Sequence, residues 1–139
     1  MAKAKQVAIL ARVPLASGLL TGKLNSQTVF EKDDHRSYNR KGEAFDVGET
    51  FSGVPYESGL RAVEKVRAIL PDGISMTQLA LRWILMFEAV TLTIPGAKNH
   101  LQSLENASAA DIPAFSKEIM TRLKQIYDED IRKEVHQRW

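Results

Sequence analysis

Residues 90–99 read Val-Thr-Leu-Thr-Ile-Pro-Gly-Ala-Lys-Asn and decide the fold. The first five are rich in β-branched side chains and end at Pro95 and Gly96, which predicts a strand followed by a tight turn. Asn99 and Gln102 then have the spacing of a capping box, in which each side chain bonds the backbone of the other residue. The sequence therefore predicts a strand that turns directly into a helix.

A second strand and three further helices are predicted around this unit. The short apolar run 7–10 predicts a strand that enters a glycine-bearing loop. Hydrophobic spacing and a second capping box predict helices over residues 60–70, from Ser75 to about Phe87, and from Ile119 toward Trp139. Residues 24–56 are rich in charge and turn formers, and their scattered aromatic side chains favour an ordered, docked loop.

This order of elements predicts an α/β fold. Strands that alternate with helices pair in parallel through βαβ crossovers, and we expect both faces of these strands to be buried. Only two strands are predicted, so both edges of their sheet would lack hydrogen-bonding partners. The sequence thus indicates part of a larger sheet, completed by more strands or by another chain.

The turn after residues 90–94 has the composition of an anion site. Small residues allow the backbone to approach a ligand, and the helix that follows presents free N–H groups and the positive end of its dipole. Lys98 adds a positive charge, and polar side chains three and four positions apart can face one ligand. The candidate residues are Gly96, Ala97, Lys98, Gln102, Glu105 and Asn106. A capped strand-to-helix turn with an exposed lysine is the alternative.

The loop from Arg12 to Lys23 is a second candidate. It leaves a predicted strand with small residues and closes with a lysine, so it could wrap a pyrophosphate. It is not a Walker loop, because the glycine spacing differs and no Ser or Thr follows the lysine. An ordinary connecting loop is the alternative.

Taken together, several motifs resemble the aldo-keto reductase family, and in particular its bacterial NADP-dependent oxidoreductases. The motifs are VPLASGLLTGK (13–23), FEKDDHR (30–36), GEAFDVGETFSGVPYESGL (42–60), IPGAKNHLQSLENASA (94–109) and VHQRW (135–139). The resemblance implies that the whole chain is the C-terminal portion of an NADP(H)-binding (β/α)8 TIM barrel. Such an incomplete barrel would contain only the last two strands, with their loops and helices.

The resemblance also implies roles for individual residues. Arg12 stands where the family places a side chain, often an aromatic one, against the nicotinamide ring. The implied cofactor contacts are Leu15, Ser17, Gly18, Leu20 and Lys23 at the pyrophosphate, Gly96, Ala97, Lys98 and Gln102 at the 2′-phosphate, and Glu105 and Asn106 at the adenine. Lys98 is expected to select NADP over NAD.

The catalytic Asp, Tyr, Lys and His set of that family is expected to be absent. It lies on earlier strands, so the chain alone would bind nucleotide without reducing aldehydes or ketones, and a carbonyl substrate would be used only in a complete barrel. The three tyrosines and three histidines are expected to serve packing or surface roles, with no catalytic or metal site among them. Phe30, Arg36 and Phe51 are expected to border the substrate pocket of a complete barrel, and Trp83 is expected in the core.

Composition excludes several other classes. With 139 residues, 44% hydrophobic content and 26% charged content, the chain has the values of an ordinary globular domain, and no apolar run is long enough to cross a membrane. The net charge of +2 is spread along the chain, which argues against nucleic acid as a partner. The absence of cysteine and of a signal-peptide pattern predicts a cytoplasmic location.

An alternative to the reductase interpretation is a truncated, non-enzymatic interaction module. In that case the unpaired strand edges would bind another protein or a second copy of the chain. The expected partners are therefore either the missing N-terminal half of the barrel or the chain itself.

Overall fold

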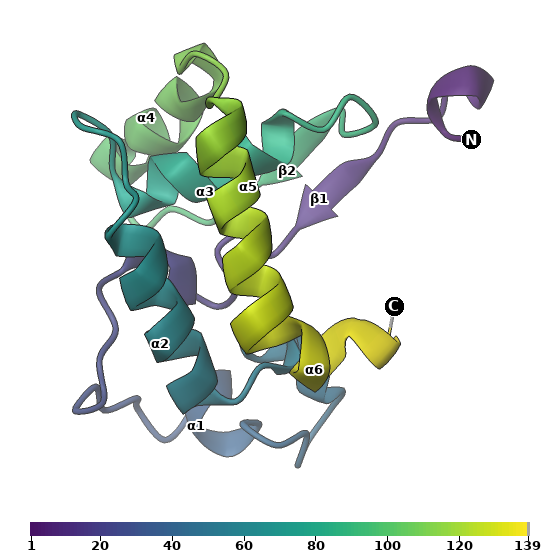
Figure 1. The fold of residues 1–139 in the computed structure, drawn as a ribbon. Coiled ribbons are helices and arrows are strands. Elements are labelled where there is room, and N and C mark those ends of the chain that lie inside the picture. Colours follow the sequence, from purple (N-terminus) through teal and green to yellow (C-terminus); the bar gives the residue numbers. More distant parts are fainter. Residues whose placement is uncertain (139) are drawn as a thin grey trace.

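The computed structural model describes residues 1–138, so the end of the last predicted helix at Trp139 lies outside the described residues. The strands are β1 (Leu10–Arg12) and β2 (Leu92–Ile94), and the α-helices are α1 (His35–Tyr38), α2 (Tyr56–Arg67), α3 (Met76–Leu85), α4 (His100–Ser108), α5 (Lys117–Ile126) and α6 (Arg132–Val135). Short 3-10 turns connect several of these elements. The two strands lie together at one side of the molecule and the longer helices at the other (Figure 1).

The two strands pair in parallel, as predicted, with Leu10 opposite Leu92. The first strand lies later in the chain than expected, because the regular ladder begins only at Leu10. One residue earlier, the N–H of Ile9 donates to the side-chain oxygen of Thr91 at 3.1 Å rather than to a backbone carbonyl. The Ile9 carbonyl oxygen still accepts from the Thr91 N–H at 2.9 Å, so backbone bonding reaches one residue beyond the regular ladder.

The expectation that both faces of the strands are buried is wrong. Leu10, Leu92 and Ile94 share one face and are 53%, 42% and 54% exposed. Ala11 and Thr93 alternate with them on the opposite, partly covered face, where α3 packs against β2. Helix α3 packs on one face of this two-stranded sheet, and no element of residues 1–138 covers the other face.

The hydrophobic core lies within the helical layer. Helix α2 packs against α5, and the core joins them to α3 and to the loop after β1 (Figure 1). Its buried members include Leu19, Phe51, Val63, Leu79 and Ile126. The prediction that Trp83 is part of this core is wrong, because its side chain is 38% exposed and packs edge-on against the Phe87 ring.

Local capping signals fix where the helices begin. Ser75 accepts a hydrogen bond from the Gln78 N–H at 3.1 Å, and the Gln78 side chain accepts one from the Ser75 N–H at 2.8 Å. This reciprocal pair confirms the predicted capping box of α3. The Asn99 side chain also caps α4, by accepting from the Gln102 N–H at 3.0 Å, but here the bond is not reciprocated at the Asn99 N–H.

The last predicted helix is interrupted after Ile126 by a π-helical turn over Tyr127–Ile131. The interruption follows from the spacing of its apolar residues. Ile131, five positions after Ile126, packs against the core, and Val135 four positions later is buried. A π-turn brings positions five apart onto one face, whereas a regular α-helix would direct Asp130 to the core instead.

The long segment between β1 and α2 is ordered, which confirms the prediction from its aromatic residues. The Phe30 ring packs against those of Phe51 and Tyr56, with ring centroids 6.1 and 6.0 Å away. Asn39, which is fully buried, binds the segment together internally. The segment therefore forms a fixed wall beside the loop that follows β1.

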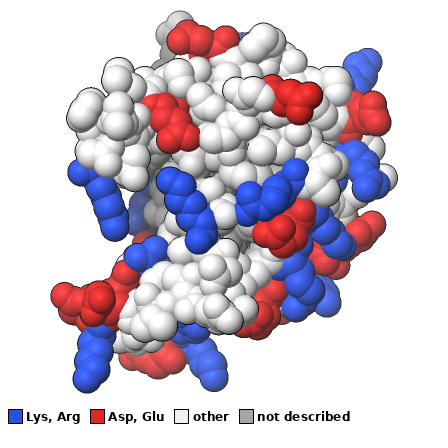
Figure 2. Space-filling model, turned by 90° about the vertical axis from the view of Figure 1, so that its left-hand side faces the viewer, with Lys and Arg blue, Asp and Glu red and all other residues white. Residues whose placement is uncertain are grey.

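Charges of both signs are mixed over the face shown in Figure 2. Several Lys and Arg side chains follow one another across its middle, with Asp and Glu side chains among and around them. Among residues 1–138, none of the helices has the length and apolar content needed to cross a membrane.

Candidate functional site

A cleft of about 610 Å³ lies between the loop after β1 and the turn after β2. Both segments follow the carboxyl ends of parallel strands, which meet at one edge of the sheet, where α/β proteins bind ligands. Ten of the twelve predicted site residues line the cleft: Leu15, Ser17, Gly18, Lys23, Gly96, Ala97, Lys98, Gln102, Glu105 and Asn106. The structure thus brings together two segments that are about 70 residues apart in sequence.

The loop after β1 has an unusual backbone. Val13, Ala16 and Ser17 have φ angles of 50°, 46° and 55°, in the left-handed region that side chains rarely adopt. Such conformations cost on the order of 1–3 kcal/mol each and persist where surrounding contacts hold them, often at ligand sites. Gly18, with a φ of 91°, adopts the same region without a side-chain penalty. The loop is therefore held in a shape that its sequence does not favour.

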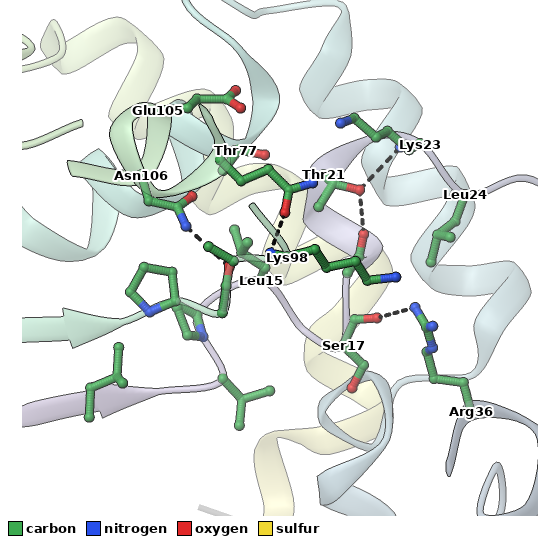
Figure 3. Close-up of a pocket in the computed structure, with 18 of the residues that line it drawn as sticks. Leu15, Ser17, Thr21, Lys23, Leu24, Arg36, Thr77, Lys98, Glu105 and Asn106 are labelled. Atoms are coloured by element: carbon green, nitrogen blue, oxygen red, sulfur yellow. Dashed lines mark hydrogen bonds between the residues drawn. The ribbon is translucent and has the colours of Figure 1, made fainter. Parts of the chain in front are cut away.

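Contacts from two neighbouring segments hold Ser17 in this shape. Its hydroxyl donates to the Glu49 carbonyl oxygen at 3.3 Å and accepts from the Phe51 N–H at 3.2 Å. Its carbonyl oxygen accepts from Arg36 Nη1 at 3.2 Å, an interaction drawn in Figure 3. Because its hydroxyl is already engaged on both sides, the main contribution of Ser17 to the site is the shape of the loop.

The opposite wall is the turn between β2 and α4. The Gln102 side chain accepts from the Lys98 N–H at 2.7 Å, and Asn106 Nδ2 donates to the Gly96 carbonyl at 3.1 Å. In a reciprocal capping box the Gln102 side chain would accept from the Asn99 N–H, but it accepts from the Lys98 N–H instead. The predicted reciprocal bond is therefore wrong. Open space surrounds the position where a Gly96 side chain would lie, and a ligand could approach the backbone there.

Glu105 connects this wall to the helical layer. Its carboxylate accepts from the Ser75 hydroxyl at 2.6 Å, so α4 is fastened to the residue that caps α3. Thr77, on the first turn of α3, also lines the cleft. The floor of the cleft therefore depends on contacts between residues about 30 positions apart.

Lys98 and Lys23 carry the positive charges of the cleft that have no acidic partner among the described residues. Figure 3 shows the Lys98 side chain extending across the cleft toward the loop that carries Ser17. Since α4 begins at His100, the positive end of its dipole adds to this charge. The combination suits a doubly charged phosphate.

Arg36, in contrast, is neutralised within the protein. It forms a two-point ion pair with Asp34, with Nη2 2.5 Å and Nε 3.0 Å from carboxylate oxygens. Hydrogen bonding to Arg36 lowers the pKa of Asp34 to about 2 and raises the pKa of Arg36. The Arg36 guanidinium also stacks on the Phe30 ring, 4.5 Å from its centroid. Its role in the cleft is to support the loop.

Two predicted site residues lie outside the cleft lining. Arg12 forms a two-point ion pair with Glu49, with both N–O distances 3.1 Å, and Leu20 packs against the hydrophobic core. In the 3-10 turn Leu19–Thr21, both Leu19 and Leu20 pack with the core, whereas Thr21 lines the cleft. The loop as a whole therefore borders the cleft, although the side chains of Arg12 and Leu20 point away from it.

Several lining residues were not among the predicted cofactor contacts. They are Val13, Pro14, Thr21, Leu24, His35, Arg36, Thr77, Ile94 and Pro95. Most of them adjoin predicted residues in sequence, and the motif that includes FEKDDHR points to His35 and Arg36. Thr77 carries no sequence signal, since only the packing of α3 brings it to the site.

Among the other side chains considered for chemistry, His35 lines the cleft and several others are engaged elsewhere. The Tyr56 hydroxyl donates to the Asn25 carbonyl at 2.8 Å in a buried position, and Tyr127 contacts His136 at 2.9 Å. Within residues 1–138, no group of three or more His, Asp or Glu side chains is arranged to hold a metal ion. The cleft can bind and orient an anionic ligand.

Comparison with protein families gives one match over most of the chain. Residues 1–128 match the model of the aldo/keto reductase family. The sequence is 32% identical over 120 residues to L-glyceraldehyde 3-phosphate reductase of Escherichia coli O157:H7, a match that covers 86% of this chain and 33% of that protein. It is 29% identical over 120 residues to a probable voltage-gated potassium channel subunit beta of Arabidopsis thaliana, covering 81% and 33%.

Solved structures give a consistent result. A glycerol dehydrogenase from Gluconobacter oxydans superposes with a TM-score of 0.69 at 26% identity, and the match covers 94% of this chain and 37% of that one. The chain thus spans about a third of the length of the relatives it matches.

Proposed function

The chain belongs to the aldo/keto reductase family, and we propose that it supplies the NADP(H)-binding C-terminal part of a (β/α)8 reductase barrel. In this proposal β1 and β2 are the last two strands of the barrel. The observation that carries it is the cleft, which joins the loop after one strand to the turn after the next. The strained loop and the turn with its lysine form its two walls, and both lie within the residues that match the family.

Lys98 and the first turn of α4 would hold the 2′-phosphate of the cofactor. The lysine supplies a full charge that is unpaired among the described residues, and the start of the helix supplies N–H groups and its dipole. Gly96 and Ala97 would let the phosphate approach the backbone, because small residues leave room there. This charge arrangement favours NADP over NAD.

The other residues would line the cofactor along the cleft. The loop with Leu15, Ser17 and Gly18 would cover the pyrophosphate, helped by the charge of Lys23. Glu105 and Asn106 would border the adenine, and their bonds to Ser75 and Gly96 hold both side chains in place. Arg12, oriented by Glu49 at the end of β1, would lie beside the nicotinamide ring.

The complete reaction would be the NADPH-dependent reduction of an aldehyde or ketone. The cofactor supplies the hydride when bound, and a general acid must protonate the carbonyl oxygen. We assign that acid and its Asp, Lys and His partners to strands of the barrel outside this chain, since none of the three tyrosines lines the cleft. The chain alone would therefore bind cofactor without turnover.

A titration followed by the fluorescence of NADPH tests this proposal. We expect saturable binding, weakened about tenfold or more by Lys98→Ala because a charge-assisted contact to phosphate is lost. The matched control is Lys117→Ala, which removes an exposed lysine from the start of α5, away from the cleft. No saturable binding, or equal losses in both variants, would overturn the proposal.

A further inference from the structure

His35 is the histidine that lines the cleft. It begins the short helix α1, and its side chain is 38% exposed. Lys23 and Lys98 line the same cleft, but histidine differs from lysine because its charge ordinarily changes between about pH 5 and 8. His35 is therefore a lining side chain of the type that can make the charge of the cleft depend on pH near neutrality.

On one side, the His35 ring meets an oxygen that can only accept a hydrogen bond. Its Nε2 atom lies 3.4 Å from Ser17 Oγ. The single hydrogen of this hydroxyl is donated to the Glu49 carbonyl, and one of its two acceptor positions is taken by the Phe51 N–H. Only the second acceptor position remains, so Nε2 must carry a hydrogen to bond Ser17.

On its other side, the ring meets a carboxylate. His35 Nδ1 lies 3.6 Å from Asp34 Oδ1, within reach of charge attraction. Asp34 is ionised near neutral pH, because hydrogen bonding to Arg36 lowers its pKa to about 2. A neutral ring with its hydrogen on Nε2 would turn the lone pair of Nδ1 toward this negative charge, whereas the imidazolium has a hydrogen on both nitrogens. The protonated ring therefore satisfies both contacts.

The other charged groups near His35 are of types that keep their charge over the range in which histidine titrates. On the two loops and across the cleft they are Arg12, Lys23, Asp34, Arg36, Glu49, Lys98 and Glu105. Lysine and arginine stay protonated well above neutral pH, and carboxylates ordinarily ionise below about pH 5. Among the described residues of the cleft lining, protonation of His35 is thus the change that adds a positive charge as the pH falls through this range.

The set of Asp34, His35 and Ser17 could instead suggest a nucleophilic triad, in which the histidine takes the proton of the serine hydroxyl. The hydrogen bonds argue against this alternative. The hydroxyl hydrogen of Ser17 is directed to the Glu49 carbonyl, and the Asp34 carboxylate is already bound by Arg36 at two points. His35 therefore faces Ser17 as a donor and not as a base.

We propose that His35 is a proton-dependent binding residue for the pyrophosphate of a dinucleotide. The inference rests on the proposed function, since it uses the same cleft and places the pyrophosphate at the loop with Ser17 and Gly18. Protonated His35 adds a positive charge beside this loop, so an anion binds more tightly, and the neutral ring lacks that charge. Affinity is highest at the acid end of the range and falls as the pH rises. By reciprocity, the bound anion favours uptake of a proton.

Calorimetric titration with NADP⁺ at low salt, from about pH 8 to about pH 5.5, tests this assignment. The 2′-phosphate of the ligand also titrates in this range, so the quantity compared is the dissociation constant of the His35→Gln variant divided by that of the wild-type chain. Glutamine keeps an N–H donor for Ser17 but never carries the charge. We expect this ratio to be about one at pH 8 and to rise to about five or more at pH 5.5.

Two further variants separate the charge from the fold. His35→Lys supplies a permanent charge, so it should bind NADP⁺ more tightly than the wild-type chain at pH 8 and with similar affinity at pH 5.5. His136→Gln is the matched control, since His136 lies in the C-terminal turn and contacts Tyr127 outside the cleft. It should follow the wild-type chain at every pH. Circular dichroism shows whether each variant is folded.

The outcomes distinguish this inference from the proposed function. If the ratio for His35→Gln does not change with pH while NADP⁺ still binds, the assignment of His35 is overturned. An equal change in His136→Gln would also overturn it, as would equal proton uptake on binding by the wild-type and His35→Gln chains, measured in buffers of different ionisation enthalpy. Failure of the wild-type chain to bind NADP⁺ at any of these pH values would instead overturn the proposed function, and this inference with it.

Discussion

Arg36 Nη1 donates a hydrogen bond to the carbonyl oxygen of Ser17 at 3.2 Å. This contact links α1 to the residue of the β1 loop whose hydroxyl is bonded to Glu49 and Phe51, and whose backbone is in the left-handed region. The shape of the cleft therefore depends on a segment that lines only part of it. The consequence is that changes in α1 should affect ligand binding through the loop.

Replacing Arg36 with Met should weaken NADPH binding. The variant keeps an apolar side chain over the Phe30 ring but removes the donor that holds Ser17, so the strained loop can relax. We expect about a tenfold loss of affinity or more, equivalent to about 1.4 kcal/mol, in a fluorescence titration. Arg122→Met on α5 is the control. Unchanged affinity in the Arg36 variant would show that the loop keeps its shape without this contact.

Asp34 should make stability depend on pH in the acid range. Its folded pKa of about 2 lies below the ordinary value of 3.8, so its contribution is complete above about pH 4 and is lost as the pH falls toward 2. The contribution is at most about 2 kcal/mol, because the side chain is partly exposed.

The test is the Asp34→Asn variant. We expect a lower free energy of unfolding at pH 7 and a flatter pH dependence between pH 4 and 2, measured by urea denaturation. Asp33→Asn, an exposed neighbour, should change neither quantity. If the free energy of unfolding has the same pH dependence in the wild-type chain and in the Asp34 variant, the ion pair between Asp34 and Arg36 is not the source of that dependence.

Asn39 should be the residue on which the order of the long loop depends. It is fully buried, its side-chain oxygen accepts from the Ala44 and Phe45 N–H groups at 2.8 Å each, and its nitrogen donates to Thr50 at 3.3 Å. Asn39→Ala leaves these buried groups without partners, which should cost about 3 kcal/mol of unfolding free energy.

Two measurements check this expectation. Urea denaturation gives the free energy, and limited proteolysis should show faster cleavage between β1 and α2. Gln27→Ala, at an exposed position in the same loop, is the control and should behave as the wild-type chain does. If the Asn39 variant resists protease equally well, the loop is ordered by its aromatic contacts alone.

Local signals predicted the beginnings of the helices and the parallel pairing. Ser75 and Asn99 cap their helices because a capping side chain acts within three residues, a range that sequence spacing shows directly. The turn around Lys98 was predicted for the same reason, since strand, turn and helix start lie within ten residues.

The features that sequence did not predict depend on distant contacts. Val13 is β-branched, and β-branched residues rarely adopt the left-handed conformation. Val13 nevertheless adopts it, because the surrounding loops hold its backbone in place. The bond from Ser75 to Glu105 spans 30 residues and has no local signature. The outward position of Leu10 was missed because burial of a strand depends on how many strands accompany it.

Calorimetric titration of the chain with NADP⁺ and with NAD⁺ tests the central claim most directly. Lys98 and the start of α4 form a site for the 2′-phosphate, the group that distinguishes the two cofactors. We therefore expect NADP⁺ to bind at least about tenfold more tightly than NAD⁺, with the difference abolished by Lys98→Ala. Equal affinities for the two cofactors, or binding of neither, would contradict the assignment of this cleft.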